Sequence, residues 1–348
     1  CRCYPPLFRI EKTPYNITVV LITQTAGIFL RILLTDVNRI SNSEISVLCA
    51  DIVRGSSMDE RYEVRASEIT ELVRDLALKA NMLLPDGLKR MIGDAYNKER
   101  MPIAKQAFSD ILKNAELAAE KNMPICQDCG LAVVFIEIGQ SISVFDGSIE
   151  DAINEGIRRA YAEGYLRKSV VKDPLFRREN SGDNTPAVIH WKITTGKDIK
   201  ITVSPKGMGS ENMSKIYMLK PADGAEGVIR SVVEAVKTAG PNPCPPIVLG
   251  IGIGGNFETV ALASKRALLK PEGVRHHISE YAEMENEILK RVNKLGIGPG
   301  GYGGMTTVLD AHIETLPTHI AGMPVAVNIC CHALRHAEGK IEGRPIDD

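Results

Sequence analysis

The feature that most constrains this fold is an alternation between short apolar runs and segments with apolar residues at helical spacing. The runs at 131–138 and 247–253 are short and continuous, which is typical of buried strands. Helical patterns follow them at 148–165 and 257–269. Such alternation predicts an α/β or mixed α+β fold. The other predicted elements are paired strands at 186–193 and 198–203, helices at 225–238 and 279–294, and a last strand at 324–330.

A helical segment precedes the first of these strands. Apolar residues recur at helical spacing over 69–76, directly after Ser67, which is a suitable N-cap. A second amphipathic helix is predicted over 104–118. We therefore expect an N-terminal helical layer over 58–122, followed by a mixed sheet-and-helix part over 123–348.

The first 57 residues differ from the rest of the chain. Their apolar stretch, 17–34, contains polar residues and Arg31, which makes it a marginal membrane span. It also lacks the basic region and small-residue cleavage site of a signal peptide. Met58 is followed at once by the helical segment. We expect Met58 to be the natural start and 1–57 to lie outside the native fold, with a genuine presequence as the alternative.

Composition excludes some partners and suggests a compartment. The chain has 42 basic and 43 acidic residues, a balance that favours neither a nucleic-acid binder nor a membrane-surface binder. Its eight cysteines are widely scattered, unlike those of a small disulfide-stapled domain. This predicts a reducing compartment, the cytoplasm, where thiols stay free for metal binding or chemistry. The alternative for each cysteine is a role as a small buried hydrophobe.

Three glycines resemble a dinucleotide-binding loop. Gly250, Gly252 and Gly255 spell G-x-G-x-x-G between a predicted strand and a predicted helix. The acidic residue expected at the end of the next strand is missing, because Glu272 lies in a loop after Pro271 and a helix follows. The glycines fit equally well where a backbone passes close to a cluster, a substrate or a neighbouring strand. A nicotinamide-binding oxidoreductase therefore stays a minor alternative.

Three cysteines lie in loops beside predicted strands. Cys126, Cys244 and Cys331 are far apart in sequence, and the chain has no short C-x-x-C-x-x-C run of the ferredoxin type. Three thiolates on a four-iron cluster would leave one iron free to act as a Lewis acid. Spacing alone leaves other interpretations open. These are a structural zinc site with His332 and His336, which would suit a non-enzymatic module, a redox pair of Cys126 and Cys129, and simple buried thiols.

Several longer motifs together carry a resemblance to a known family. They are Cys126-Gln127-Asp128, KGMGSEN at 206–212, GIGIGG at 250–255 and the segment 328–338. From Ser67 to Gly343 the chain resembles the alpha subunits of class I fumarases and tartrate dehydratases. The resemblance implies a hydro-lyase that hydrates fumarate to malate, a step of the tricarboxylic acid cycle, on a substrate-binding 4Fe-4S cluster. Tartrate dehydration is the alternative activity.

The resemblance also assigns the cluster ligands. It implies ligation by Cys126, Cys244 and Cys331. The family's third ligand precedes His-Ala, which selects Cys331 rather than Cys330. Cys129 is a departure, because the family usually has threonine there, and we expect it to be a bystander.

The same resemblance implies a substrate site. Gln127, Asp128, Arg167, Gly209 and His319 match substrate-contacting positions of the family. Asp128 and His319 are the candidates for orienting the substrate or relaying the proton. Without the resemblance, Arg167 would be interpreted as a surface cation and His319 as a loop histidine.

The resemblance further implies a partner subunit. Single-chain members of the family have an additional C-terminal domain that supplies more arginine, lysine and threonine side chains to the substrate. A dicarboxylate needs both ends held, and Arg167 is the one obvious clamp here. We therefore expect a separate beta subunit in a hetero-oligomer, with no nucleic acid and no membrane among the partners.

Overall fold

The computed structural model of the chain describes residues 7–13, 16–22, 27–32 and 61–346, and Met58 lies outside these ranges. The chain divides into two units, Cys1–Glu60 and Arg61–Asp348. In the first unit, strands β1 (Leu7–Thr13), β2 (Asn16–Ile22) and β3 (Gly27–Ile32) form an antiparallel sheet in that order. That 1–57 lie outside the native fold stays a prediction.

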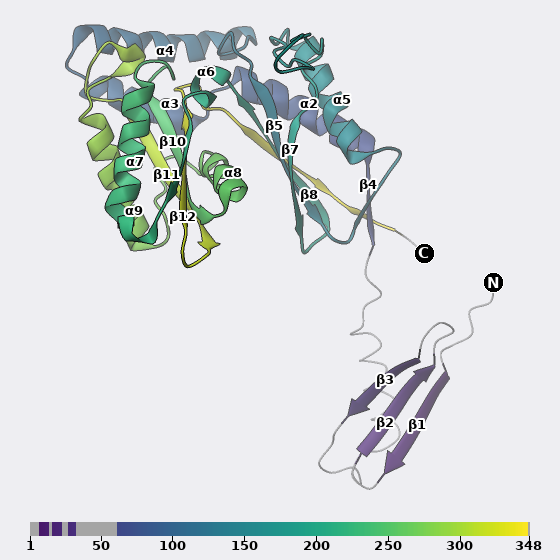
Figure 1. Cartoon of the computed structure of the whole chain (residues 1–348). Coiled ribbons are helices and arrows are strands. Elements are labelled where there is room, and N and C mark those ends of the chain that lie inside the picture. Colours follow the sequence, from purple (N-terminus) through teal and green to yellow (C-terminus); the bar gives the residue numbers. More distant parts are fainter. Residues whose placement is uncertain (1–6, 14–15, 23–26, 33–60, 347–348) are drawn as a thin grey trace. The chain divides into compact units, whose positions relative to one another are not determined.

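The second unit contains two lobes, each built on a four-stranded sheet (Figure 1). The first sheet has the order β13-β8-β5-β7, and α2 and α5 pack together beside it. A small sheet of order β14-β4-β6 adjoins this lobe. The elements are β4 (Tyr62–Arg65), α2 (Ala66–Met82), β5 (Leu131–Gly139), β6 (Ile142–Phe145), α5 (Ile149–Glu163), β7 (Val188–Thr194), β8 (Asp198–Lys206), β13 (Ala337–Glu342) and β14 (Arg344–Pro345).

The second lobe holds a sheet of order β11-β10-β12-β9. Helix α8 lies on one face of this sheet, and α7 and α9 lie on the other (Figure 1). Helices α3 and α4 pack on its end through Leu88, Ile92 and Phe108. The elements are α3 (Asp86–Lys98), α4 (Pro102–Lys121), α6 (Met208–Glu211), β9 (Lys215–Leu219), α7 (Gly224–Ala239), β10 (Ile247–Gly255), α8 (Phe257–Ala267), α9 (Ser279–Asn293), β11 (Val308–Thr318) and β12 (Met323–Cys330).

The mixed α/β prediction is confirmed, and the central strands are the ones with continuous apolar runs. Ile136 of β5 and Ile251 of β10 are fully buried, and burying such a side chain stabilises the fold by about 1.5–3 kcal/mol. The predicted pairing of the strands at 186–193 and 198–203 with each other is wrong. Strand β5 lies between them, parallel to β7 and antiparallel to β8. Strand β5, the most apolar of the three, thus has a paired strand on each of its two edges.

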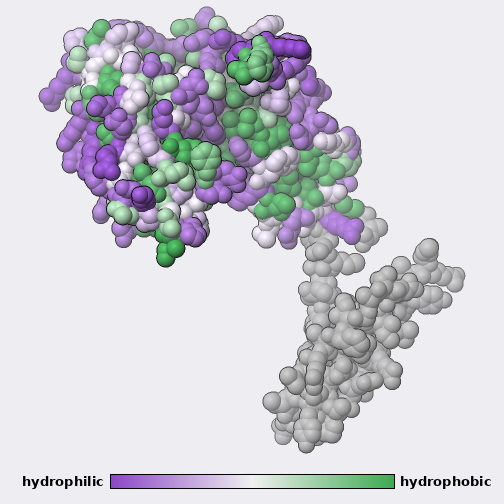
Figure 2. Space-filling model, viewed as in Figure 1, coloured by the Kyte–Doolittle hydropathy of each residue, from purple (hydrophilic) through white to green (hydrophobic). Residues whose placement is uncertain are grey.

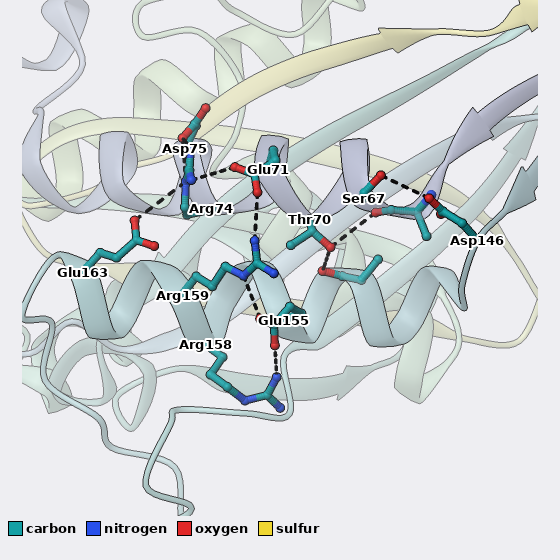
Figure 3. Close-up of polar contacts among 12 residues, drawn as sticks. Ser67, Thr70, Glu71, Arg74, Asp75, Asp146, Glu155, Arg158, Arg159 and Glu163 are labelled. Carbon is teal, nitrogen blue, oxygen red and sulfur yellow. Dashed lines mark hydrogen bonds and ion pairs between the residues drawn. The ribbon is translucent and has the colours of Figure 1, made fainter.

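Helices α2 and α5 pack closely and are linked by polar contacts (Figure 3). Gly156 allows this approach, because a Cβ there would lie 2.7 Å from the Thr70 carbonyl oxygen. The predicted N-cap Ser67 is inside the first turn of α2. The backbone N–H of Ala66 instead donates to Asp146, a residue from a distant loop, at 2.7 Å. Ser148, the first residue of the predicted helix 148–165, caps α5 and accepts from the Asp151 N–H at 3.4 Å.

Strand β7 is an edge strand of the first sheet. It pairs with β5 alone among the described strands, and Val188, Trp191 and Ile193 on it are exposed. Figure 2 shows hydrophobic surface gathered over this lobe. An exposed apolar edge strand is a surface on which other chains can pair or pack.

Candidate functional site

The site begins with two cysteine loops at one end of the second sheet. Cys244 lies in the loop before β10, and Cys331 directly follows β12. These strands are antiparallel, with Val248 opposite Cys330, so both loops lie at the same end. His332 Nδ1 is 3.0 Å from the Cys244 carbonyl oxygen, which joins the two loops directly.

The Cys126 loop reaches the same place from the first lobe. Ile125 packs in an apolar cluster with Ala333 and Cys331, which brings the loop before β5 against the loop after β12. Burial raises the pKa of the Cys244 thiol, and the nearby Cys126 thiol raises it further. Cys244 also has a φ of 53°, a left-handed conformation that is costly for a non-glycine residue and is often found at functional sites. The three predicted ligands therefore come from three loops that meet.

Asp128 fastens a fourth segment to this meeting point. Its Oδ2 accepts a hydrogen bond from the Met208 N–H at 2.9 Å, and its Oδ1 accepts one from the Gly130 N–H at 2.9 Å. The carboxylate thus holds the 206–212 segment against the Cys126 loop. A Cβ at Gly209 would meet only the Asn242 carbonyl oxygen, at 4.0 Å, so Gly209 is open and lies beside the Cys244 loop.

Gln127 and Arg167 border the same loop. The Cys126 Sγ lies 3.3 Å from Gln127 Oε1, and Gln127 is exposed. The Arg167 N–H donates to the Cys129 Sγ at 3.1 Å, which fixes the Arg167 backbone to the cysteine loop. The Arg167 side chain is exposed and has no hydrogen-bond or ion-pair partner within the described ranges. It is therefore available to bind an anion.

His319 is placed elsewhere. It follows β11, whose Thr318 pairs with Gly255 at the far end of β10 from the cysteine loops. At about 3.3 Å per residue, the eight steps from Ile247 to Gly255 separate the two ends by about 26 Å. His319 is exposed, and its Nδ1 accepts the Ala321 N–H at 3.1 Å. Within one chain the structure brings together every predicted site residue except this histidine.

A buried ionic network that the sequence analysis did not assign supports the 206–212 segment. Lys206 is 4% exposed, and its Nζ lies 3.1 Å from Glu211 Oε2 and donates to the Ile329 carbonyl oxygen at 2.9 Å. Glu211 also binds Lys265 and Asn328. Lys206 and Glu211 stand in the KGMGSEN motif and Asn328 opens the segment 328–338, so the motifs were the available signal. The network ties this segment to β12, the strand that ends just before Cys331.

The thiols at the site fit an iron–sulfur cluster in chemistry. All three cysteines are free, and thiolates are the ligands that such clusters take. No three Cys, His, Asp or Glu side chains in the described part of the chain are grouped closely enough to hold one metal ion. This argues against a zinc site and leaves a cluster open, because each thiolate of a cluster binds a different iron. The guanidinium of Arg335, which is buried beside the cysteine loops and whose Nε has no hydrogen-bond partner, also fits an anionic group.

The three glycines at 250–255 serve packing. A Cβ at Gly250 would lie 2.0 Å from the Ser264 carbonyl oxygen, and one at Gly252 would lie 2.3 Å from the Val260 carbonyl oxygen. Helix α8 therefore fills the space above both glycines. This geometry supports the interpretation that the glycines let a neighbouring backbone pass close by. The geometry does not indicate a dinucleotide-binding loop.

Free thiols, the 206–212 segment and an exposed arginine thus lie at one place in a mixed α/β fold, and the glycines at 250–255 do not form a dinucleotide loop. The family model described as "Fumarate hydratase (Fumerase)" matches residues 70–340. A "Putative L(+)-tartrate dehydratase subunit alpha" of Methanocaldococcus jannaschii is 41% identical over 280 residues, covering 79% of this chain and 98% of that protein. The "L(+)-tartrate dehydratase subunit alpha" of Escherichia coli is 30% identical over 273 residues, covering 77% and 89%.

The chain belongs to this fumarate hydratase family and is a hydro-lyase. The suspected relationship is thereby confirmed. None of the helices in the described ranges is both long and apolar enough to span a membrane.

Proposed function

We propose that this chain is the alpha subunit of a fumarate hydratase that holds a substrate-binding 4Fe-4S cluster on Cys126, Cys244 and Cys331. The observation that carries the proposal is the meeting of three free-thiol loops from two lobes at one place. A reducing compartment, the cytoplasm, suits such thiols, and the reaction would serve the tricarboxylic acid cycle.

When bound, the cluster would supply a Lewis-acidic iron for the hydroxyl group that is added or removed. The chain's own residues would bind and orient the substrate. Arg167 would clamp one carboxylate through its free guanidinium, and Gln127 would donate its amide beside it. Gly209 leaves room for the substrate to approach the backbone. The Asp128 carboxylate accepts hydrogen bonds from two backbone N–H groups. We therefore assign Asp128 the role of positioning the 206–212 segment rather than a role in proton transfer.

We further propose that a beta subunit completes the site in a hetero-oligomer. Arg167 is the predicted carboxylate clamp that the described residues bring to the cysteine loops, whereas the substrate would have two carboxylates. His319, a predicted catalytic residue, lies about 26 Å away along the sheet. The second clamp and the proton-transferring group would therefore come from outside this chain. The relatives' designation as alpha subunits supports this.

Tartrate dehydration is the second candidate. It is favoured by the names of the two relatives, which are both tartrate dehydratase alpha subunits. An extra substrate hydroxyl could be accommodated by small changes in the pocket. Competition between fumarate, malate and L(+)-tartrate in one assay of the two-subunit enzyme decides between them. A kcat/KM for L(+)-tartrate that is higher than the values for fumarate and malate would show that tartrate is the substrate.

The ligand assignment is tested by serine substitutions. Cys126→Ser, Cys244→Ser and Cys331→Ser should each abolish the visible absorption and the bound iron of anaerobically purified protein. Cys129→Ser and Cys330→Ser are the matched controls and should keep the cluster. Loss of the cluster in Cys330→Ser with retention in Cys331→Ser would reverse the third assignment.

The subunit proposal has its own test. The purified chain should load a cluster yet turn over fumarate and malate negligibly, and addition of the beta subunit should restore activity. Full hydratase activity from this chain alone would contradict the split site.

A further inference from the structure

Arg335 is a buried cation that the proposed chemistry has not yet used. It lies four residues after Cys331 and is 3% exposed. Its Nη2 donates to the Asp128 carbonyl oxygen at 2.6 Å, and the Ser204 hydroxyl donates to the Arg335 carbonyl oxygen at 3.3 Å. The guanidinium thus reaches from the loop after β12 to the Cys126 loop.

The charge of Arg335 has no counter-ion within the described residues. No carboxylate lies within ion-pair distance, and its Nε has no hydrogen-bond partner. Lys206, the other buried cation near the site, has Glu211 at 3.1 Å. A buried charge without a partner is strongly unfavourable, and a native protein keeps one where an anionic group compensates it.

Arg335 lies next to the cysteine loops. The Asp128 carbonyl oxygen accepts from its Nη2 at 2.6 Å, and the Asp128 N–H donates to the Cys126 Sγ at 3.4 Å. Ala333, two residues before Arg335, packs in one cluster with Cys331 and Ile125. The guanidinium therefore lies where the cysteine loops meet, and its positive charge would favour an anionic group there.

We propose that Arg335 is a positioning and charge-compensating residue for the cluster site: it offsets the negative charge of the thiolate-ligated cluster and holds the Cys126 loop through the Asp128 carbonyl oxygen. The inference rests on the proposed cluster and deepens it, because it names the side chain on which loading depends. Arg335 acts through the thiolates and the loop, without touching substrate.

Two consequences distinguish this role from a structural one. Without the cluster, an unpaired guanidinium is a cost, so replacing it with a neutral side chain should leave the apoprotein as stable as wild type or more stable. With the cluster, loss of the positive charge should speed iron release and shift the reduction potential to more negative values. A side chain that merely supports the fold would instead destabilise the apoprotein when replaced.

The experiment compares Arg335→Gln and Arg335→Lys with wild type and with a control, Arg275→Gln. Glutamine keeps a neutral amide donor on a side chain two bonds shorter and carries no charge, whereas lysine keeps the charge and loses the planar fork. Arg275 forms ion pairs with Asp310 and Glu285, and its partners among the described residues include no proposed cysteine ligand, so its loss should weaken the fold alone.

Full-length chains are loaded anaerobically with ferrous iron and sulfide. The measurements are iron and sulfide per chain, the rate of iron release to a chelator, and urea unfolding of each apoprotein. We expect Arg335→Gln to release iron about 10–100-fold faster than wild type, with Arg335→Lys between them and apoprotein stability kept. We expect Arg275→Gln to lose apoprotein stability and to keep the wild-type release rate.

Iron release at the wild-type rate from Arg335→Gln would overturn the inference while leaving the cluster proposal intact. Apoprotein destabilisation in Arg335→Gln equal to that in Arg275→Gln would also overturn it, because the role would then be structural. A wild-type chain that loads no cluster would overturn the proposed function and this inference together.

Discussion

Replacing Glu211 by glutamine is the sharpest test of how the site is supported. Glu211 is the one carboxylate that the described residues bring to Lys206, whose side chain is 5% exposed, and it also binds Lys265 at 2.5 Å. Glu211→Gln keeps the shape of the side chain and removes its charge. Lys206 would then be a buried cation without an anion, which costs about 3–5 kcal/mol of the free energy of unfolding.

The pH dependence of stability gives a second value for the contribution of the Glu211 charge to the free energy of unfolding. Burial raises the pKa of Glu211, but the charges of Lys206 and Lys265 outweigh it and lower the pKa from 4.5 to about 2. At about 1.36 kcal/mol per unit, the shift corresponds to at most about 3 kcal/mol of stability. Since the folded pKa is depressed, this stability is present above pH 4.5 and is lost as the pH falls toward 2.

The assay is urea unfolding of the apoprotein at pH 7 and at several values down to pH 3.5, followed by circular dichroism. The stability difference between wild type and Glu211→Gln should be about 3 kcal/mol at pH 7 and should narrow below pH 4.5. The control is Glu226→Gln, which breaks an exposed ion pair with Arg291 and should cost less than about 1 kcal/mol. A loss below 1 kcal/mol in Glu211→Gln, or a difference that does not change with pH, would refute the reasoning.

Three further predictions concern packing, the start of the chain and air sensitivity. Gly252→Ala should lower the free energy of unfolding by about 1–3 kcal/mol, because the new Cβ would meet the Val260 carbonyl oxygen. Gly93 has open space around it in a helix, so Gly93→Ala should raise the free energy of unfolding by up to about 1 kcal/mol. Thermal melts check both. A chain that begins at Met58 should fold and load iron as the full chain does, and an insoluble truncated protein would contradict this. Air should inactivate the enzyme and ferrous iron with thiol should restore it, so activity that survives prolonged aeration would argue against a cluster.

Local patterns predicted the elements, and long-range pairing was beyond them. The apolar runs located β5 and β10, and Ser148 located the start of α5, because each signal lies within the element itself. The positions of β7 and β8 depend on which strand pairs with each edge of β5, and that pairing joins segments that are far apart in the sequence. The cap of α2 likewise comes from Asp146, about eighty residues away, so Ser67 was a misleading local signal.

The site was predictable where motifs carried it. The cysteine loops and the glycine-rich loop meet because Asp128, a motif residue, bonds to Met208. Sequence did not reveal that Lys206 and Arg335 are buried, since a cation's burial depends on the packing of both lobes around it. The separation of His319 from the cysteines follows from the direction of β11, which the match of His319 to a family position cannot show.

The cations of the site divide by exposure, and this division bears on what the chain does alone. Arg335 and Lys206 are buried beside the cysteine loops, where they can act on thiolates and backbone but cannot reach a dissolved substrate. Arg167 is exposed and reaches solvent, held at its backbone by Cys129. One exposed guanidinium can hold one carboxylate in bidentate fashion and leaves the other end of a dicarboxylate free to rotate. Since orientation contributes about 7–11 kcal/mol to catalysis in favourable cases, this arrangement supports the proposal that the chain holds the cluster and one end of the substrate, while a beta subunit supplies the other clamp.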